Sequence, residues 1–124
     1  MQFKTETKDQ YTLISVQNGS LDAGAAAELA DMCEKLSAQG SRNYIVDCAV
    51  CQEVSADFIE PACELSASVY ETGKSFVLAN TPSELTALLK QQDAIDLLNC
   101  APTFAEAVDI ISMEILERDL FDEE

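Results

Sequence analysis

The fold is decided by residues 43–79, which read NYIVDCAVCQEVSADFIEPACELSASVYETGKSFVLA. This stretch begins and ends with a short apolar run, at 43–47 and at 75–79, and each run is typical of a buried strand. Between the two runs, residues 55–70 carry apolar side chains at three- and four-residue steps, which indicates a helix. A strand, a helix and a second strand in this order predict two parallel strands joined by a right-handed crossover.

The same alternation continues on both sides of this stretch. Pro61 is tolerated only in the first turn of a helix, so we expect the helix after the first strand to begin near residues 58–60. An Ala-rich periodic segment at 23–38, with Asp22 as its N-cap and Gly40 as its stop, predicts a preceding helix. Toward the N-terminus we expect strands at 1–8 and 11–17, joined by a turn at 8–10, and a further turn at 18–20. Toward the C-terminus we expect a short strand at 97–100 and two helices, which begin at the capping boxes Thr81-Pro82-Ser83-Glu84 and Thr103-Phe104-Ala105-Glu106.

The charge of the chain restricts the partners that it can bind. Acidic residues number 23 against 7 basic ones, which gives a net charge of −16. Binding to a phosphate backbone depends on Lys and Arg, so nucleic acids and anionic membrane surfaces are unfavourable partners. No apolar run approaches the ~20 residues of a membrane span, and we expect no secretory leader, because the first residues lack the charged-then-apolar-then-small pattern of one. Five cysteines, an odd number, fit a reducing compartment, so we expect a cytoplasmic protein whose partners are proteins, cations or basic surfaces.

The side chains offer little chemistry for catalysis. The chain has no His, which removes His-activated nucleophiles and the usual zinc sites. Cys48 and Cys51 could form a redox or metal-binding pair, but they follow an apolar run, and the charges of Asp47 and Glu53 would raise their pKa; we interpret them as small apolar residues. Glu53 and Asp57 could pair as acid and base, but no other catalytic group is evident. We expect a protein without enzymatic activity, cofactor or metal.

Binding sites of open α/β sheets lie beyond the carboxyl ends of strands, where the loops at 18–22 and 51–57 are expected. The order and spacing of these elements resemble the STAS domain of bacterial anti-sigma factor antagonists. The resemblance spans residues 8–112 and is carried by Thr12 to Val16, Gly19 to Asp22, Ile45 to Asp47, residues 71–80 and residues 103–107. It implies an α/β fold: a STAS-like single domain at 1–113, with a mixed four- to five-stranded sheet and about four helices packed mainly on one face, followed by an acidic tail at 114–124.

The resemblance also implies partner switching. Such a protein binds a serine-kinase anti-sigma factor and thereby frees a sigma factor; the kinase phosphorylates a serine at the start of the second helix, and a phosphatase resets it. The family motif there reads Asp-Ser-Ser-Gly-Leu or Asp-Ser-Thr-Gly-Leu. With Val54 and Ile59 placed on the flanking apolar positions, Ser55 falls on the Asp, Ala56 on the first Ser, Asp57 on the phosphorylated Ser and Phe58 on the Gly. A fixed carboxylate therefore replaces the phosphoacceptor, and Phe58 adds bulk where a kinase would approach.

We therefore predict a non-enzymatic interaction module that binds an anti-sigma factor or a similar regulator in transcription or stress signalling, without the usual serine phosphoswitch. The predicted partner-binding residues are Gly19, Asp22, Glu53, Ser55, Asp57, Phe58 and Ile59. Asp57 is read as a first-turn acid or a partial phosphomimetic, and Ser55 as an N-cap or a displaced phosphosite. Alternatives are an ordinary antagonist phosphorylated at Ser55, and a scaffold or accessory subunit of a transporter or signalling complex, including a homodimer. The acidic tail is read as a solvated helix end or, through Leu116, Leu120 and Phe121, as a docking segment.

Overall fold

The computed structural model describes residues 3–17 and 19–122, so the turn expected at 18–20 lies partly outside the described residues. The elements follow one another as β1 (Phe3–Thr7), β2 (Thr12–Val16), β3 (Ser20–Leu21), α1 (Ala23–Ala38), β4 (Asn43–Asp47), β5 (Glu53–Val54), the 3₁₀ turn η1 (Ala56–Phe58), α2 (Ile59–Glu71), β6 (Ser75–Ala79), α3 (Ser83–Gln91), β7 (Asn99–Ala101) and α4 (Phe104–Asp122).

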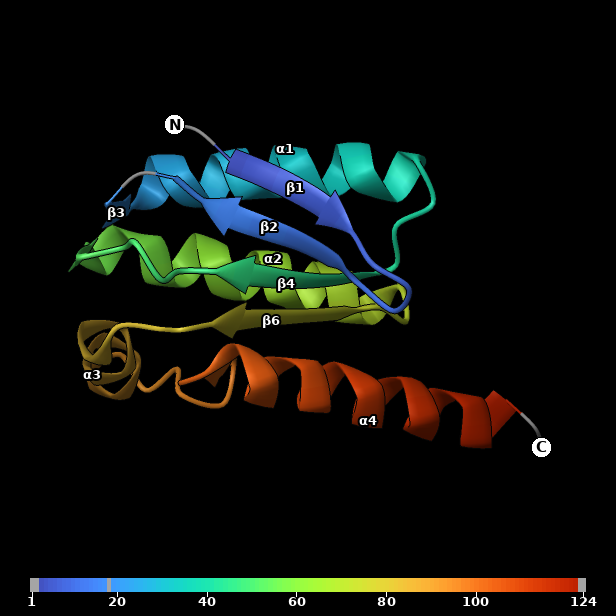
Figure 1. Ribbon diagram of the computed structural model, residues 1–124. Coiled ribbons are helices and arrows are strands. Elements are labelled where there is room, and N and C mark those ends of the chain that lie inside the picture. Colours follow the sequence, from blue (N-terminus) through green and yellow to red (C-terminus); the bar gives the residue numbers. More distant parts are fainter. Residues whose placement is uncertain (1–2, 18, 123–124) are drawn as a thin grey trace.

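Five strands form a mixed sheet in the order β1-β2-β4-β6-β7 (Figure 1). β1 and β2 are the antiparallel hairpin expected at the N-terminus, closed by a hydrogen bond from Lys8 N–H to Tyr11 O of 2.8 Å. The pairs β2–β4, β4–β6 and β6–β7 are parallel, as the crossovers require. All five residues of β6 are buried, because helices cover the centre of the sheet on both faces. The predicted α/β fold with a mixed sheet is confirmed.

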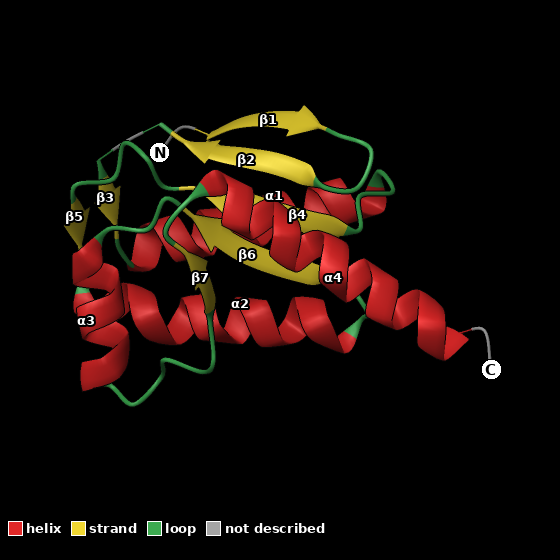
Figure 2. Cartoon of the chain, turned by 60° about the horizontal axis from the view of Figure 1, so that its bottom comes forward, coloured by secondary structure: helices red, strands yellow, loops and turns green. Residues whose placement is uncertain are grey.

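Two apolar cores lie on opposite faces of this sheet. On one face, Tyr44, Val46, Phe76 and Leu78 pack with the apolar sides of α1, α2 and α3. On the other face, Ile45, Val77 and Ala79 pack against Ala107 and Ile111 of α4. Figure 2 shows α4 in front of the sheet, with α1 behind the sheet and α2 below it. Three of the four helices thus share one face, as expected, and α4 shields the alternate residues of the same strands from water.

The helix starts test the capping predictions. Asp22 caps α1, because its Oδ1 accepts a hydrogen bond of 2.8 Å from Ala25 N–H. Thr103 caps α4 in the same way, because its Oγ1 accepts a hydrogen bond of 3.1 Å from Glu106 N–H. Pro61 is the third residue of α2, in the first turn where a proline N–H is not needed. The capping box predicted at Thr81 is not formed. α3 begins at Ser83, after Pro82, and the Thr81 hydroxyl instead donates a hydrogen bond of 3.4 Å to Ala101 O.

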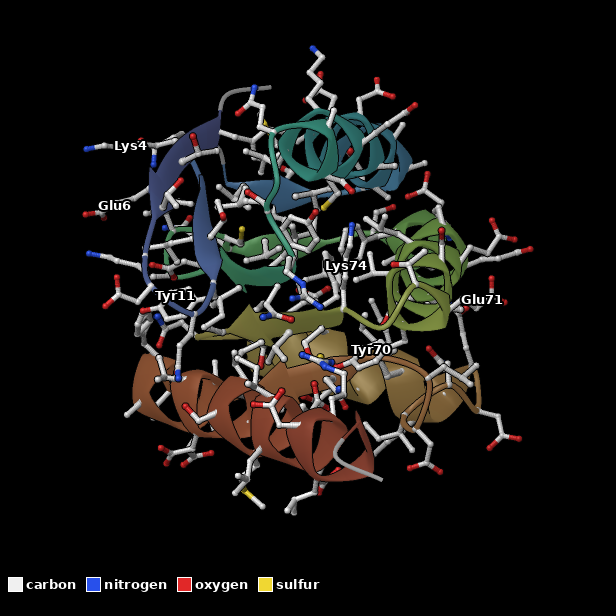
Figure 3. The ribbon with its side chains drawn as sticks, turned by 90° about the vertical axis from the view of Figure 1, so that its right-hand side faces the viewer. Lys4, Glu6, Tyr11, Tyr70, Glu71 and Lys74 are labelled. Atoms are coloured by element: carbon white, nitrogen blue, oxygen red, sulfur yellow. The ribbon has the colours of Figure 1, made fainter. Side chains whose placement is uncertain are left out.

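The C-terminal helix continues past residue 114 without a break and contacts the domain there. The Tyr70 hydroxyl donates to Glu114 at 2.8 Å and accepts from Asn99 Nδ2 at 2.6 Å. The Arg118 guanidinium donates to Ser75 and Asn43, each at 2.9 Å. Figure 3 looks onto this end of the molecule, where Tyr70 and Lys74 lie near the middle of the view and Lys4 and Glu6 project outward from β1. The first part of the expected tail, through residue 122, is thus an extension of α4.

Candidate partner-binding rim

A second, two-stranded parallel sheet joins the two loops that the sequence singles out. β3 pairs with β5 in the register Ser20↔Glu53 and Leu21↔Val54. Gly19 O accepts from the N–H groups of Gln52 and Glu53 at 2.8 and 2.9 Å, and Ser55 N–H donates to Leu21 O at 2.8 Å. The exposed or half-buried residues Gly19, Asp22, Glu53, Ser55 and Asp57 are thereby brought to one edge, beside the N-termini of α1 and η1. We call these five residues the rim.

Two rim carboxylates converge on the N-terminus of α1. Besides the cap from Asp22, Asp57 Oδ1 accepts a hydrogen bond of 3.2 Å from Ala23 N–H, the first residue of the helix. The first N–H groups of a helix have no partner within the helix, and the helix dipole favours negative charge at that end. Asp57 also lies in the first turn of η1, as expected for a first-turn acid. The hydrogen bond between Asp57 and Ala23 could not be predicted from a local sequence pattern, because the two residues are 34 positions apart.

Ser55 occupies the N-cap position of η1 without using its hydroxyl as a cap. Its backbone is extended, with φ −94° and ψ 144°, and its carbonyl accepts from Phe58 N–H at 3.0 Å. The side chain is exposed and makes no capping hydrogen bond within the described residues. The predicted N-cap position is therefore correct, while the hydroxyl remains at the surface.

Phe58 and Ile59, expected to face a partner, are core residues. Phe58 is 0% exposed and Ile59 is 1% exposed. Both belong to the core between α1, α2 and the sheet, and η1 packs against α1 and α2. The 3₁₀ turn directs Phe58 inward, so its side chain fills the interior. The prediction that these two side chains form part of the contact surface is therefore wrong for this conformation.

The charged side chains of the segments that form the rim are all acidic, although the end of α3, where Lys90 lies, reaches them through a hydrogen bond of 3.2 Å from Gln92 Nε2 to Ala56 O. Neither residues 19–34 nor residues 43–73 contain Lys or Arg. Asp22, Glu53, Asp57 and the exposed Glu60 therefore have no basic residue close to them in sequence. A surface of one sign favours encounter with a surface of the opposite sign, at a rate that falls with ionic strength.

The Cys48–Cys51 pair lies just before the rim, in the turn that follows β4. Both side chains are buried, neither forms a disulfide within the described residues, and Cys51 N–H donates to Cys48 O at 2.9 Å. A hydrogen bond between the two thiols, together with burial, raises the pKa of Cys48, and the same hydrogen bond lowers the pKa of Cys51. The rise in pKa expected from the sequence is therefore found for Cys48 but not for Cys51, where the hydrogen bond from Cys48 outweighs the opposing effect of the Asp47 charge. In the described part of the chain, no group of three or more His, Cys, Asp or Glu side chains could hold a metal ion.

A cleft lies at the other end of the sheet, away from the rim. It has a volume of about 720 Å³ and lies between the turn after β1, the segment that leads into β4, and the late part of α4. None of the predicted site residues lines it. Among the described residues, no helix combines the length and the apolar character that crossing a membrane requires.

Several solved structures have an architecture similar to this one. No family model matches the sequence, and no curated protein matches it. Among solved structures, the anti-sigma factor antagonist SpoIIAA of Bacillus, in its unphosphorylated form, is similar with a TM-score of 0.67 and 14% identity, over 90% of this chain and 96% of that one. An anti-sigma-factor antagonist (STAS) domain protein from Planctomyces limnophilus has a TM-score of 0.66 and 17% identity, over 89% and 97% of the two chains. The murine anion transporter Slc26a9 has a TM-score of 0.67 and 12% identity, over 87% of this chain and 18% of the transporter.

The chain therefore has the fold of STAS domains, as seen in anti-sigma factor antagonists. The resemblance inferred from the motifs is confirmed at the level of the fold. One similar structure is the anti-sigma factor antagonist SpoIIAA, nearly all of which matches this chain, and in another the matching part is 18% of an anion transporter.

Proposed function

We propose that this chain is a non-enzymatic interaction module that binds a regulatory protein through the rim, as an anti-sigma factor antagonist does, and that it lacks the serine phosphoswitch. In this proposal it acts in the cytoplasm of a bacterium. The fold shared with SpoIIAA and the Planctomyces protein supports an interaction module of this class. The position of Asp57 supports the absence of the switch.

Asp57 is the observation that carries the proposal. The resemblance aligns it with the phosphorylated serine, and its carboxylate already binds the N-terminus of α1 through Ala23 N–H. A phosphoserine would bring about −1.5 to −2 charges that a phosphatase can remove. A carboxylate brings one permanent negative charge, which the helix dipole stabilises by about 0.3–1 kcal/mol. The rim therefore keeps one electrostatic state, and a kinase has no serine to modify at this position.

The charge of the rim defines the chemistry of the partner. Asp22, Glu53 and Asp57 present carboxylates on exposed or half-buried positions. A partner surface with Lys or Arg opposite these carboxylates would be steered toward the rim. We expect the association rate to fall as salt is raised, because a rim charge acts mainly on the encounter.

The experiment combines binding and phosphorylation. The chain is mixed with serine-kinase anti-sigma factors of its host and ATP, and complexes and intact masses are measured. We expect a complex without added phosphate, and we expect the charge reversals Glu53→Lys and Asp57→Lys to weaken it at least tenfold. Glu71→Lys, which reverses an exposed charge at the opposite end of α2, is the matched control and should leave binding unchanged. Equal binding by all three variants would refute the rim as the contact surface.

Asp57→Ser tests the missing switch directly. It returns a hydroxyl to the aligned position while the surrounding backbone stays the same. Phosphate on this variant alone would support Asp57 as the residue that removes the switch. Phosphate on Ser55 of the parent chain would instead establish the alternative, an ordinary phosphoregulated antagonist, because the Ser55 hydroxyl is exposed.

A second candidate function is an accessory module of a larger assembly. The occurrence of the same fold within Slc26a9 supports it. In that case we expect the chain to be isolated with the other subunits of a complex, or as a homodimer that persists on dilution at varied salt in sedimentation velocity. A monomer at all concentrations, together with rim-dependent binding of an anti-sigma factor, would favour the first function.

A further inference from the structure

The C-terminal helix carries apolar side chains on two opposite sides. Its inner side buries Ala107 and Ile111 against the sheet. Its outer side presents Met113, Leu116 and Leu120, which are 62%, 61% and 58% exposed. These three residues follow one another at steps of three and four, so they lie on one face of the helix. A helix that is apolar on both sides is typical of a helix covered on both sides, and here the sheet covers only one.

Carboxylates accompany this apolar stripe. Glu106, Asp109 and Glu117 are exposed and lie on the same face by the 3.6-residue period. No Lys or Arg occurs between Lys90 and Arg118. The guanidinium of Arg118 turns away to the sheet, where it binds Ser75 and Asn43. The outer face from 106 to 120 thus combines three apolar side chains with three negative charges. Its length is about 21 Å, at 1.5 Å per residue.

We propose that this face, which we call the α4 stripe, docks a basic amphipathic helix of a partner protein. The stripe consists of Glu106, Asp109, Met113, Leu116, Glu117 and Leu120. The apolar side chains would be covered by the apolar face of the incoming helix, and its Lys and Arg residues would meet the flanking carboxylates. Charge complementarity selects this occupant. A second copy of the chain would place the same carboxylates opposite one another, and an anionic lipid surface would be repelled.

This surface is separate from the rim. The rim lies at the edge formed by β3, β5 and the start of α1, whereas α4 crosses the other face of the main sheet (Figure 2). A protein bound at the rim would therefore leave the α4 stripe open. The chain could hold two partners at once, a property that the proposed function does not require.

The experiment uses the full chain and a synthetic peptide of 18 residues, built from Leu and Lys in an amphipathic helical pattern. Binding is followed by amide chemical shifts of the ¹⁵N-labelled chain. We expect shifts confined to residues 106–120 and an affinity that falls with salt. The triple variant M113Q/L116Q/L120Q should bind at least tenfold more weakly, and L116Q alone should give part of this loss. Gln resembles Leu and Met in helix propensity, so the variants should retain the parent melting temperature. L97Q, at another exposed leucine, is the matched control and should bind as the parent does.

Peptide controls separate this site from general attraction to an acidic protein. A scrambled peptide of the same Leu and Lys content, without an apolar face, should bind weakly, and a peptide with Glu in place of Lys should not bind. Equal binding of the amphipathic peptide to the parent and the triple variant would overturn the proposal, as would shifts located at the rim. A dimer in sedimentation velocity that the triple variant abolishes would also overturn it, because the stripe would then be occupied by a second copy. The variants Glu53→Lys and Asp57→Lys should leave peptide binding at the stripe intact, so this test is independent of the rim.

Discussion

Replacing Phe58 with alanine tests whether the start of α2 belongs to the core or to a contact surface. The Phe58 side chain is 0% exposed and lies in the core shared by α1 and α2. Truncating a buried Phe to Ala costs about 3–5 kcal/mol, because transfer free energy is lost and a cavity remains. With an unfolding entropy of about 2.1 cal/mol/K for each of the 124 residues, the melting temperature should fall by roughly 12–19 °C.

The assay is urea and thermal unfolding followed by circular dichroism. Phe58→Leu serves as a milder variant, since it retains most of the volume and should cost only about 1 kcal/mol. This second variant keeps the test informative if the alanine variant fails to fold. A contact-surface residue would change the free energy of unfolding by no more than about 0.5 kcal/mol. Melting of Phe58→Ala within about 2 °C of the parent would therefore refute the assignment to the core.

Three further changes test contacts that hold the helices. Asp22→Ala should lower the free energy of unfolding in urea by about 1 kcal/mol, because Ala25 N–H loses its cap; an unchanged midpoint would contradict the cap. Tyr70→Phe should cost about 1.5–3 kcal/mol through the lost bond to Glu114. Burial, and after it the nearby Glu114, raises the pKa of Tyr70 to about 12. The contribution of Tyr70 to the free energy of unfolding is therefore complete below about pH 10 and is lost as the pH rises through about 12. The difference in stability between the parent and the Tyr70→Phe variant should shrink in alkali, and a constant difference would count against this contact. Arg118→Gln should speed hydrogen exchange in α4 after residue 114, and identical exchange would show that its bonds to the sheet are not needed there.

The main sheet could be predicted from the sequence because its signals are local. The apolar runs at 43–47 and 75–79 are short, bounded by polar residues and separated by a periodic helix, and each became a central parallel strand. Pro61 located the start of α2 to within a residue, since a proline excludes itself from the helix interior. The caps at Asp22 and Thr103 depend on hydrogen bonds within three residues, which a sequence pattern can represent.

The geometry of the rim could not be predicted in the same way. Two-residue strands such as β3 and β5 have no periodicity, and they pair residues 33 positions apart. The bond from Asp57 to Ala23 is likewise non-local. Alignment with the glycine of the family motif predicts Phe58 at the surface, and no local pattern reveals that a 3₁₀ turn rotates its side chain inward. The contacts that α4 makes from residue 114 onward join Glu114 to Tyr70 and Arg118 to Asn43, and these partners are far apart along the chain.

The position of α4 on its own face of the sheet has a consequence for synthesis on the ribosome. Ile45, Val77 and Ala79 are covered on this face by α4, which follows every strand of the main sheet along the chain. A nascent chain that ends before residue 104 can complete the layer of α1 and α2, yet it presents a bare apolar sheet face on the other side. Such half-covered intermediates are prone to aggregate, so we expect termination before residue 104 to leave an aggregation-prone product.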